Sequence, residues 1–277
     1  MTEHQDEDGG RSASWLEQFA EDLKEAREAA GLSVRELAGQ TSYSYQQVSN
    51  VENRQRTPSE AFSREVDAAF GGGTRFQRLH KRLVLDQYPV WFRSVAREEG
   101  RATRIKTYQC QVPHGLLQVE DYARELMREA RPRDSHQKID ADVEARMSRR
   151  SVLASPTPPL LWMVLDEGFL RRPIGGPQVM VAQLNRLLEE SESTNIVIQI
   201  LEYSAGAHPG LNGSFTLLSY ADRDDVMYVE GLGTGQLVQD QRSVERAHFA
   251  YDLLQAAACS QDRSRDLIRS AVKDYQS

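Results

Sequence analysis

Cysteine is scarce in this sequence, which contains only Cys110 and Cys259 among 277 residues. Two cysteines cannot form the framework of a disulfide-stabilised secreted domain, so we expect a reducing, cytoplasmic location. They also fall short of the three or four clustered ligands that a zinc site requires. We therefore expect neither a metal site nor another cofactor.

Long hydrophobic runs are missing as well. No stretch approaches the roughly 20 apolar residues of a membrane span, so we expect no membrane contact. Residues 1–13 are acidic and polar, which argues against a secretory signal and predicts a disordered lead. With 39% hydrophobic and 27% charged residues, the chain has the composition of a globular protein, and its length suits two domains.

The sequence also has no overall excess of positive charge. Its formal net charge of −7 argues against a general affinity for nucleic acid. Between residues 31 and 64, however, the arginines Arg35, Arg54, Arg56 and Arg64 stand against the glutamates Glu36, Glu52 and Glu60. Any DNA contact would thus be a local patch, which lowers non-specific affinity without preventing a specific contact.

The spacing of apolar residues predicts an all-helical domain over residues 14–70, with helices at about 15–30, 33–40, 44–53 and 59–70. Ser33 and Ser44 each begin a capping box, because a glutamate or glutamine follows three residues later. In the third of these helices only Val48 and Val51 are expected to point inward. The glycines at 71–73 predict a linker over residues 71–75.

The second and third helices, joined by a short turn, match the arrangement of a helix-turn-helix. In that motif the third helix lies in the major groove, where Gln, Asn and Ser side chains read base edges. We therefore predict an operator in double-stranded DNA as the ligand, contacted by Ser33, Arg35, Ser44, Tyr45, Gln46, Gln47, Ser49, Asn50, Arg54 and Arg56. From periodicity alone, a merely solvated polar face remains the alternative.

Within that set, we expect Tyr45, Gln46, Ser49 and Asn50 to read bases. Arg54 and Arg56 are the expected phosphate contacts.

The segment REAAGLSVRELAGQTSYSYQQVSNVENRQRTPS resembles the phage-repressor type of helix-turn-helix, the XRE family. The residues that match the family pattern are Arg27, Gly31, Leu32, Ser33, Leu37, Ala38, Ser44, Val48, Ser49, Val51, Glu52, Arg56 and Pro58. Arg54 departs from it, because the family usually has a glycine there for a left-handed turn, although the neighbouring Asn53 tolerates that conformation. The resemblance covers residues 15–70 and implies a transcription regulator, which we expect to bind a two-fold operator as a homodimer.

Residues 76–277 show helical segments alternating with short strands, which predicts an α+β (or α/β) domain. The expected strands lie at 105–112, 160–165 and 196–201, followed by a meander over 215–239. The expected helices lie at 76–99 (broken at Pro89), 119–130, 139–153, 179–188, 241–258 and 264–275.

Segments such as VPHGLLQVEDYARELM, VLDEGFLRRPIGGPQVMVAQLNRLLE and IVIQILEYSAGAHPGLNGSFTLLSY resemble the C-terminal domain of actinobacterial WhiJ-like regulators, which are described as antitoxin-like. His114 is inserted into the usual V-P-G-L-L-Q-T motif, and Val119 replaces its threonine. The resemblance implies that this domain binds a small protein encoded by a neighbouring gene. An antitoxin-like module that neutralises its partner and a small-molecule-sensing repressor remain alternatives.

Catalysis is not expected in this domain. Asp166 and Glu167 could serve acid–base chemistry with His208, but a carboxylate pair more simply caps a helix beginning at Gly168 or Phe169. The glycines at 175 and 176 lack the sequence context of a phosphate-binding loop.

Arginines are dense in this domain, at Arg146, Arg149, Arg150, Arg171 and Arg172. They predict either salt bridges to the abundant acidic residues or a docking surface for an acidic partner.

Overall fold

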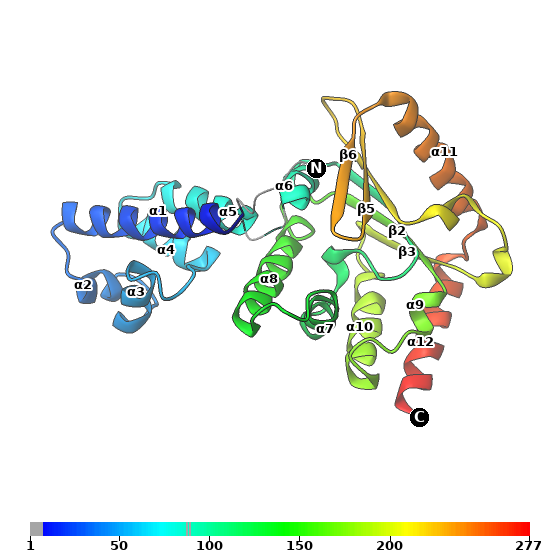
Figure 1. Ribbon diagram of the computed structural model, residues 1–277, viewed down its shortest axis with the longest axis horizontal. Helices are drawn as coiled ribbons and strands as arrows, with labels where there is room; N and C mark the ends of the chain where they lie inside the picture. The colour runs from blue at the N-terminus through cyan, green and yellow to red at the C-terminus, as the bar shows by residue number, and fades with distance from the viewer. Residues whose placement is uncertain (1–7, 87, 89) are drawn as a thin grey trace, which may run out of the picture. The chain divides into compact units, whose positions relative to one another are not determined.

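The computed structural model describes residues 8–86, 88 and 90–277 and separates the chain into two compact units, Met1–Arg93 and Ser94–Ser277 (Figure 1). The first unit is helical, and the second combines helices with a six-stranded sheet. This confirms the predicted fold class. Helix α6 (Val90–Glu99) contains the boundary between the two units.

The helices of the first unit are α1 (Asp8–Ala29), α2 (Val34–Gly39), α3 (Tyr45–Glu52), α4 (Glu60–Ala69) and α5 (Arg75–Asp86). Buried side chains from each of them form one core that includes Phe19, Leu37, Val48, Phe62 and Phe76. Helix α1 begins at Asp8, so residues 8–13 are helical and not part of a disordered lead. Once a helix is nucleated, each added residue gains a hydrogen bond, which favours extension of α1. Residues 1–7 lie outside the described residues.

The glycines at 71–73, predicted to lie in a linker between domains, instead form a turn inside the first unit. Asp67 is buried, and its carboxylate accepts hydrogen bonds from the amides of Phe76 (2.9 Å) and Gln77 (3.0 Å) at the start of α5. The ring of Phe76 then packs edge-on against Phe19, with centroids 5.4 Å apart. Glycine marks a turn but does not specify where the next element packs, and here the amphipathic α5 folds back onto α1 and α4.

The second unit is built on one mixed sheet in the order β3-β2-β1-β4-β5-β6. Its strands are β1 (Arg104–Gln109), β2 (Leu160–Asp166), β3 (Ile196–Leu201), β4 (Phe215–Ser219), β5 (Val226–Gly231) and β6 (Thr234–Val238). β1 pairs with β2 and β2 with β3 in parallel, whereas the β1–β4, β4–β5 and β5–β6 pairs are antiparallel. The three predicted strands and the predicted meander are thus all present.

Parallel neighbours require long crossover connections, and helices provide them. The β1–β2 connection contains η1 (Gly115–Leu117), α7 (Glu120–Ala130), α8 (His136–Ser148) and η2 (Arg149–Val152). The β2–β3 connection contains α9 (Gly168–Arg171) and α10 (Pro177–Glu190). Beyond β3 lie the short turns η3 (Tyr203–Ala205) and η4 (Pro209–Asn212), and after the meander come α11 (Gln241–Ala257) and α12 (Gln261–Gln276).

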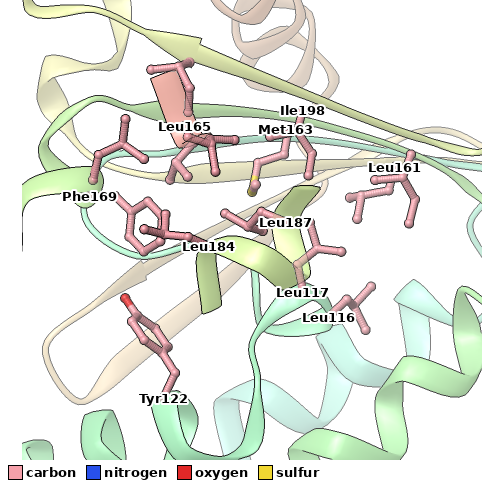
Figure 2. Close-up of a cluster of buried hydrophobic side chains, with 14 of the residues drawn as sticks. Leu116, Leu117, Tyr122, Leu161, Met163, Leu165, Phe169, Leu184, Leu187 and Ile198 are labelled. Atoms are coloured by element: carbon pink, nitrogen blue, oxygen red, sulfur yellow. The ribbon is translucent and has the colours of Figure 1, made fainter. Parts of the chain in front are cut away.

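Helices cover both faces of this sheet, because successive side chains of a strand point to opposite faces. On one face, Met163 of β2 and Ile198 of β3 pack with Leu184 and Leu187 of α10, as Figure 2 shows. Helix α12 belongs to the same core. On the other face, Val164 of β2 packs with residues of α11. Figure 1 shows α11 and the pair α10–α12 on opposite sides of the strands.

Within the described ranges, no helix is long and apolar enough to cross a membrane. The same ranges contain no group of three or more His, Cys, Asp or Glu side chains that could hold a metal ion. Cys110 and Cys259 are both free thiols.

Candidate nucleic-acid interface

Two capping boxes set the starts of α2 and α3, as the sequence predicts. Ser33 Oγ accepts a hydrogen bond from the Glu36 amide (3.2 Å), and the Glu36 carboxylate accepts one from the Ser33 amide (2.7 Å). At α3, Ser44 Oγ accepts from the Gln47 amide (3.3 Å), and Gln47 Oε1 accepts from the Ser44 amide (2.9 Å). Ser33, Ser44 and Gln47, all predicted to contact DNA, therefore have side chains that hold helix ends.

The orientation of α3 is fixed from its inner side. Val48 and Val51 are buried, in agreement with the prediction. Arg27 of α1 binds both carboxylate oxygens of Glu52, from Nε at 2.7 Å and from Nη2 at 3.1 Å, and also donates to the Leu32 carbonyl (2.9 Å). Because the Arg27 and Glu52 side chains are only 11% and 9% exposed, the pair is shielded from water.

The outer side of α3 brings together the four residues predicted to read bases. Tyr45 and Gln46 are exposed, and Ser49 and Asn50 are half-buried one helical turn further on. Gln46 Nε2 donates to Asn50 Oδ1 at 2.9 Å, so these two side chains form a fixed row along the helix. Asn53 Nδ2 donates to the Ser49 carbonyl (2.8 Å) and hydroxyl (3.2 Å). The helix therefore presents a continuous polar surface.

Arginines flank this surface. The Arg35 guanidinium lies over the ring of Tyr45, 5.5 Å from its centroid, in a cation–π contact. The Arg56 side chain is exposed and has no hydrogen-bond or ion-pair partner among the residues that the structure describes. Both guanidinium groups are exposed to solvent.

Arg54 adopts the left-handed conformation, with φ 62°, at the position where the sequence comparison expects glycine. Asn53 has φ −90°, so the strained turn falls on Arg54 itself. The Gln55 amide donates to the Asn50 carbonyl (2.8 Å), which closes the end of α3. The Arg54 guanidinium binds Glu17 and Glu21 of α1, each at 3.0 Å. Its phosphate contact stays a prediction, and one that requires these ion pairs to open.

In the second unit, Asp166 and Glu167 hold local structure. Asp166 Oδ1 accepts from the amide of Gly168 (2.8 Å), the first residue of α9, whereas the N-cap residue Glu167 makes no side-chain capping hydrogen bond. The Glu167 carboxylate binds Arg171 (3.1 Å) and the Tyr203 amide (2.9 Å). His208 packs against the ring of Tyr108, with centroids 5.7 Å apart.

The arginine clusters separate into different environments. Arg149 forms a buried ion pair with Glu99, and Arg171 forms an exposed one with Glu167. Arg146 donates to Gln118 Oε1 at 2.8 Å. Salt bridging therefore accounts for part of these clusters, whereas Arg150 lines a pocket for which the sequence gives no signal.

Comparison with known families agrees with this division of the chain. Residues 18–75 match a helix-turn-helix domain, and residues 92–270 match a domain of unknown function (DUF5753). Searches of curated proteins and of solved structures each gave no match. The second match spans more than half of the chain. The chain therefore belongs to the DUF5753 family, with a helix-turn-helix domain preceding the family's domain of unknown function.

Proposed function

We propose that this protein is a sequence-specific transcription regulator of the phage-repressor (XRE) type, which binds its operator as a homodimer. The observation that carries the proposal is the polar row of Gln46 and Asn50 on a helix whose orientation is fixed by Val48, Val51 and the Arg27–Glu52 pair. The helix-turn-helix match over residues 18–75 supports it. In this motif such a helix enters the major groove.

The Gln46–Asn50 hydrogen bond suggests how a base is read. Gln46 uses its amide nitrogen and Asn50 its amide oxygen, so Gln46 Oε1 remains as an acceptor and Asn50 Nδ2 as a donor. Adenine presents the complementary pair in the major groove, its N6 donor beside its N7 acceptor. Tyr45 and Ser49, on the same side of α3, would contact the neighbouring base pairs.

Phosphate contacts would orient the helix on the duplex. The Ser44 capping box satisfies the amides of Ser44 and Gln47. The amides of Tyr45 and Gln46 lie between them in the first turn, where helix geometry provides no acceptor, and they can donate to a phosphate. Arg35 and Arg56 would add charge, so binding would weaken steeply with salt.

The test combines Gln46→Ala with Asn50→Ala in the full-length protein. Chromatin mapping supplies the operator, and fluorescence anisotropy measures affinity for it and for a scrambled duplex. We expect the double variant to lose at least tenfold in operator affinity, since one good base contact contributes about 1–3 kcal/mol of discrimination. Binding to the scrambled duplex should change little.

Gln18→Ala is the matched control, because Gln18 also donates to the residue four positions on, Asp22 (2.6 Å), but from α1. It should bind the operator normally. Unchanged operator affinity in a folded double variant would remove the assigned role from Gln46 and Asn50.

We further propose that the second unit binds a small partner protein, as in WhiJ-like regulators. Supporting this, Phe249 and Leu253 are 67% and 45% exposed and lie one turn apart on the same face of α11. Exposed apolar side chains that gather in one place are typical of protein interfaces.

Phe249→Asp should prevent co-purification with the product of the neighbouring gene and leave DNA binding intact. If the Phe249→Asp variant still co-purifies with that product, Phe249 does not lie in the contact with the partner. If the Gln46→Ala, Asn50→Ala double variant still suppresses the activity of that product, the protein acts on it as an antitoxin.

A further inference from the structure

Arg150 and Arg186 line one pocket in the second unit. The pocket has a volume of about 390 Å³ and lies between η2, the C-terminal part of α10 and the start of β3. Glu190 and Asn195 complete its polar side, and Leu153 and Ile196 contribute apolar surface. A volume of this size is typical of sites for small organic ligands.

Both arginines have buried donors without acceptors. Arg150 Nε and Nη2, and Arg186 Nε, have no hydrogen-bond partner within the described part of the chain. Nε and Nη2 form the edge of a guanidinium that binds a carboxylate or phosphate through two parallel hydrogen bonds. Arg27 and Arg149 use this same edge to bind Glu52 and Glu99. Arg150 therefore lacks an acceptor of the kind that Arg27 and Arg149 have.

The charges around the pocket favour an anion. Burial lowers the pKa of Arg150, the nearby charge of Arg186 lowers it further, and Glu190 and Glu120 act in the opposite direction. Glu190 is bound by Arg186 and Glu120 by Arg124, so neither carboxylate is engaged by Arg150. The side chains that line the pocket thus include two guanidinium groups and one carboxylate.

We propose that this pocket binds a small organic anion, whose carboxylate or phosphate group lies between Arg150 and Arg186 and whose apolar part contacts Leu153 and Ile196. Buried donors without acceptors cost free energy. An anion bound in this way supplies those acceptors. Because the unpaired donors are shielded from water, this binding requires the two side chains to turn toward the anion. The proposal does not depend on DNA binding.

Isothermal titration calorimetry of the full-length protein tests it, with inorganic phosphate and hexanoate as separate probes at constant ionic strength. We expect at least one probe to bind at one site per chain with millimolar affinity or better. Because hydrogen bonds to charged groups are the stronger ones, Arg150→Gln should weaken that binding by about tenfold to a hundredfold. Binding of phosphate alone or of hexanoate alone identifies the head group, and binding of neither overturns the proposal.

Arg246→Gln is the matched control. It removes the same charge from an exposed position on α11, the helix that covers the other face of the sheet. It should leave binding of the probe unchanged. Equal weakening in Arg150→Gln and Arg246→Gln would show that only net charge matters and would overturn the proposed site.

Arg150→Lys keeps the positive charge but cannot form two parallel hydrogen bonds to one anion. It therefore tests the proposed site if Arg150→Gln does not fold. This variant should have the melting temperature of the wild-type protein but bind the probe at least several-fold more weakly. Unchanged binding in Arg150→Lys and in Arg186→Lys would leave the two arginines a structural role only.

Discussion

Arg149 donates from Nε and Nη2 to the two carboxylate oxygens of Glu99, at 3.0 and 2.8 Å, and the Glu99 side chain has no exposed surface. His114 Nε2 lies 3.4 Å from the same carboxylate. Glu99 ends α6, Arg149 begins η2 and His114 precedes η1, so one buried charge joins segments that are 15 to 50 residues apart. Neither Arg149 nor Glu99 can lose the other without leaving a buried charge uncompensated.

Glu99→Ala should therefore destabilise the second unit strongly. Removal of one partner from a buried ion pair typically costs about 3–5 kcal/mol, because the other charge stays buried. Urea denaturation followed by circular dichroism measures the loss. The control is Glu125→Ala, since Glu125 pairs with Arg128 at 3.0 Å but both side chains are partly exposed. Exposed pairs contribute less than about 1 kcal/mol, and equally small losses in both variants would contradict the importance of the buried pair.

We expect His114 to make the stability of the protein depend on pH. Burial lowers its pKa to about 4, and this outweighs the opposing effect of Glu99. Between pH 6.5 and 4 the unfolded state therefore binds more protons than the folded state. The histidine has no such effect above pH 6.5, and it destabilises the fold progressively as the pH falls toward 4, by roughly 3 kcal/mol in total. Neutral His114 also provides the Nδ1 acceptor that the Leu116 amide approaches at 3.5 Å.

Melting temperatures measured from pH 7.5 to 4.5 check this, with His114→Gln as the comparison. The variant has an amide that does not titrate, so its melting temperature should fall less over the same interval. Parallel curves for the two proteins would show that His114 does not cause the acid sensitivity.

Gly210 is required for close packing. A Cβ atom at this position would lie 2.3 Å from Cε1 of the buried Tyr108 ring. Gly210→Ala therefore forces the turn η4 away from the sheet, at a cost of about 1–3 kcal/mol. Gly231→Ala is the control, because a Cβ there meets nothing closer than Thr234 at 3.7 Å, and it should unfold at nearly the wild-type urea concentration. An equally stable Gly210→Ala would mean that Tyr108 and the turn readily move apart.

The sequence predicts local structure well because the signals are local. The Ser44 capping box fixes the start of α3, and the apolar run at 196–201 coincides with β3 (Ile196–Leu201). The strand order and the packing of α5 against α1 depend on contacts between distant segments, for which periodicity gives no signal.

The same limit applies to the candidate sites. The polar side of α3 follows from helical spacing, but the partners of Arg54 lie 33 and 37 residues away. Adjacent arginines also separate, because neighbouring residues of a helical turn point in different directions. Arg149 thus reaches Glu99, whereas Arg150 lines the pocket. A run of arginines in the sequence cannot reveal that difference.

Arg54 and Arg56 should differ in their contribution to DNA binding, although they are only two residues apart. The Arg56 guanidinium is exposed, with no ion-pair partner among the described residues, whereas Glu17 and Glu21 already hold that of Arg54. Arg56→Gln should weaken binding to operator and scrambled duplex alike and reduce the slope of log K against log salt by about 1. Arg54→Gln should change that slope less, since its charge is compensated before DNA arrives. Anisotropy titrations over a series of salt concentrations measure both slopes, and an equal reduction would mean that Arg54 exchanges its carboxylates for phosphate on the duplex.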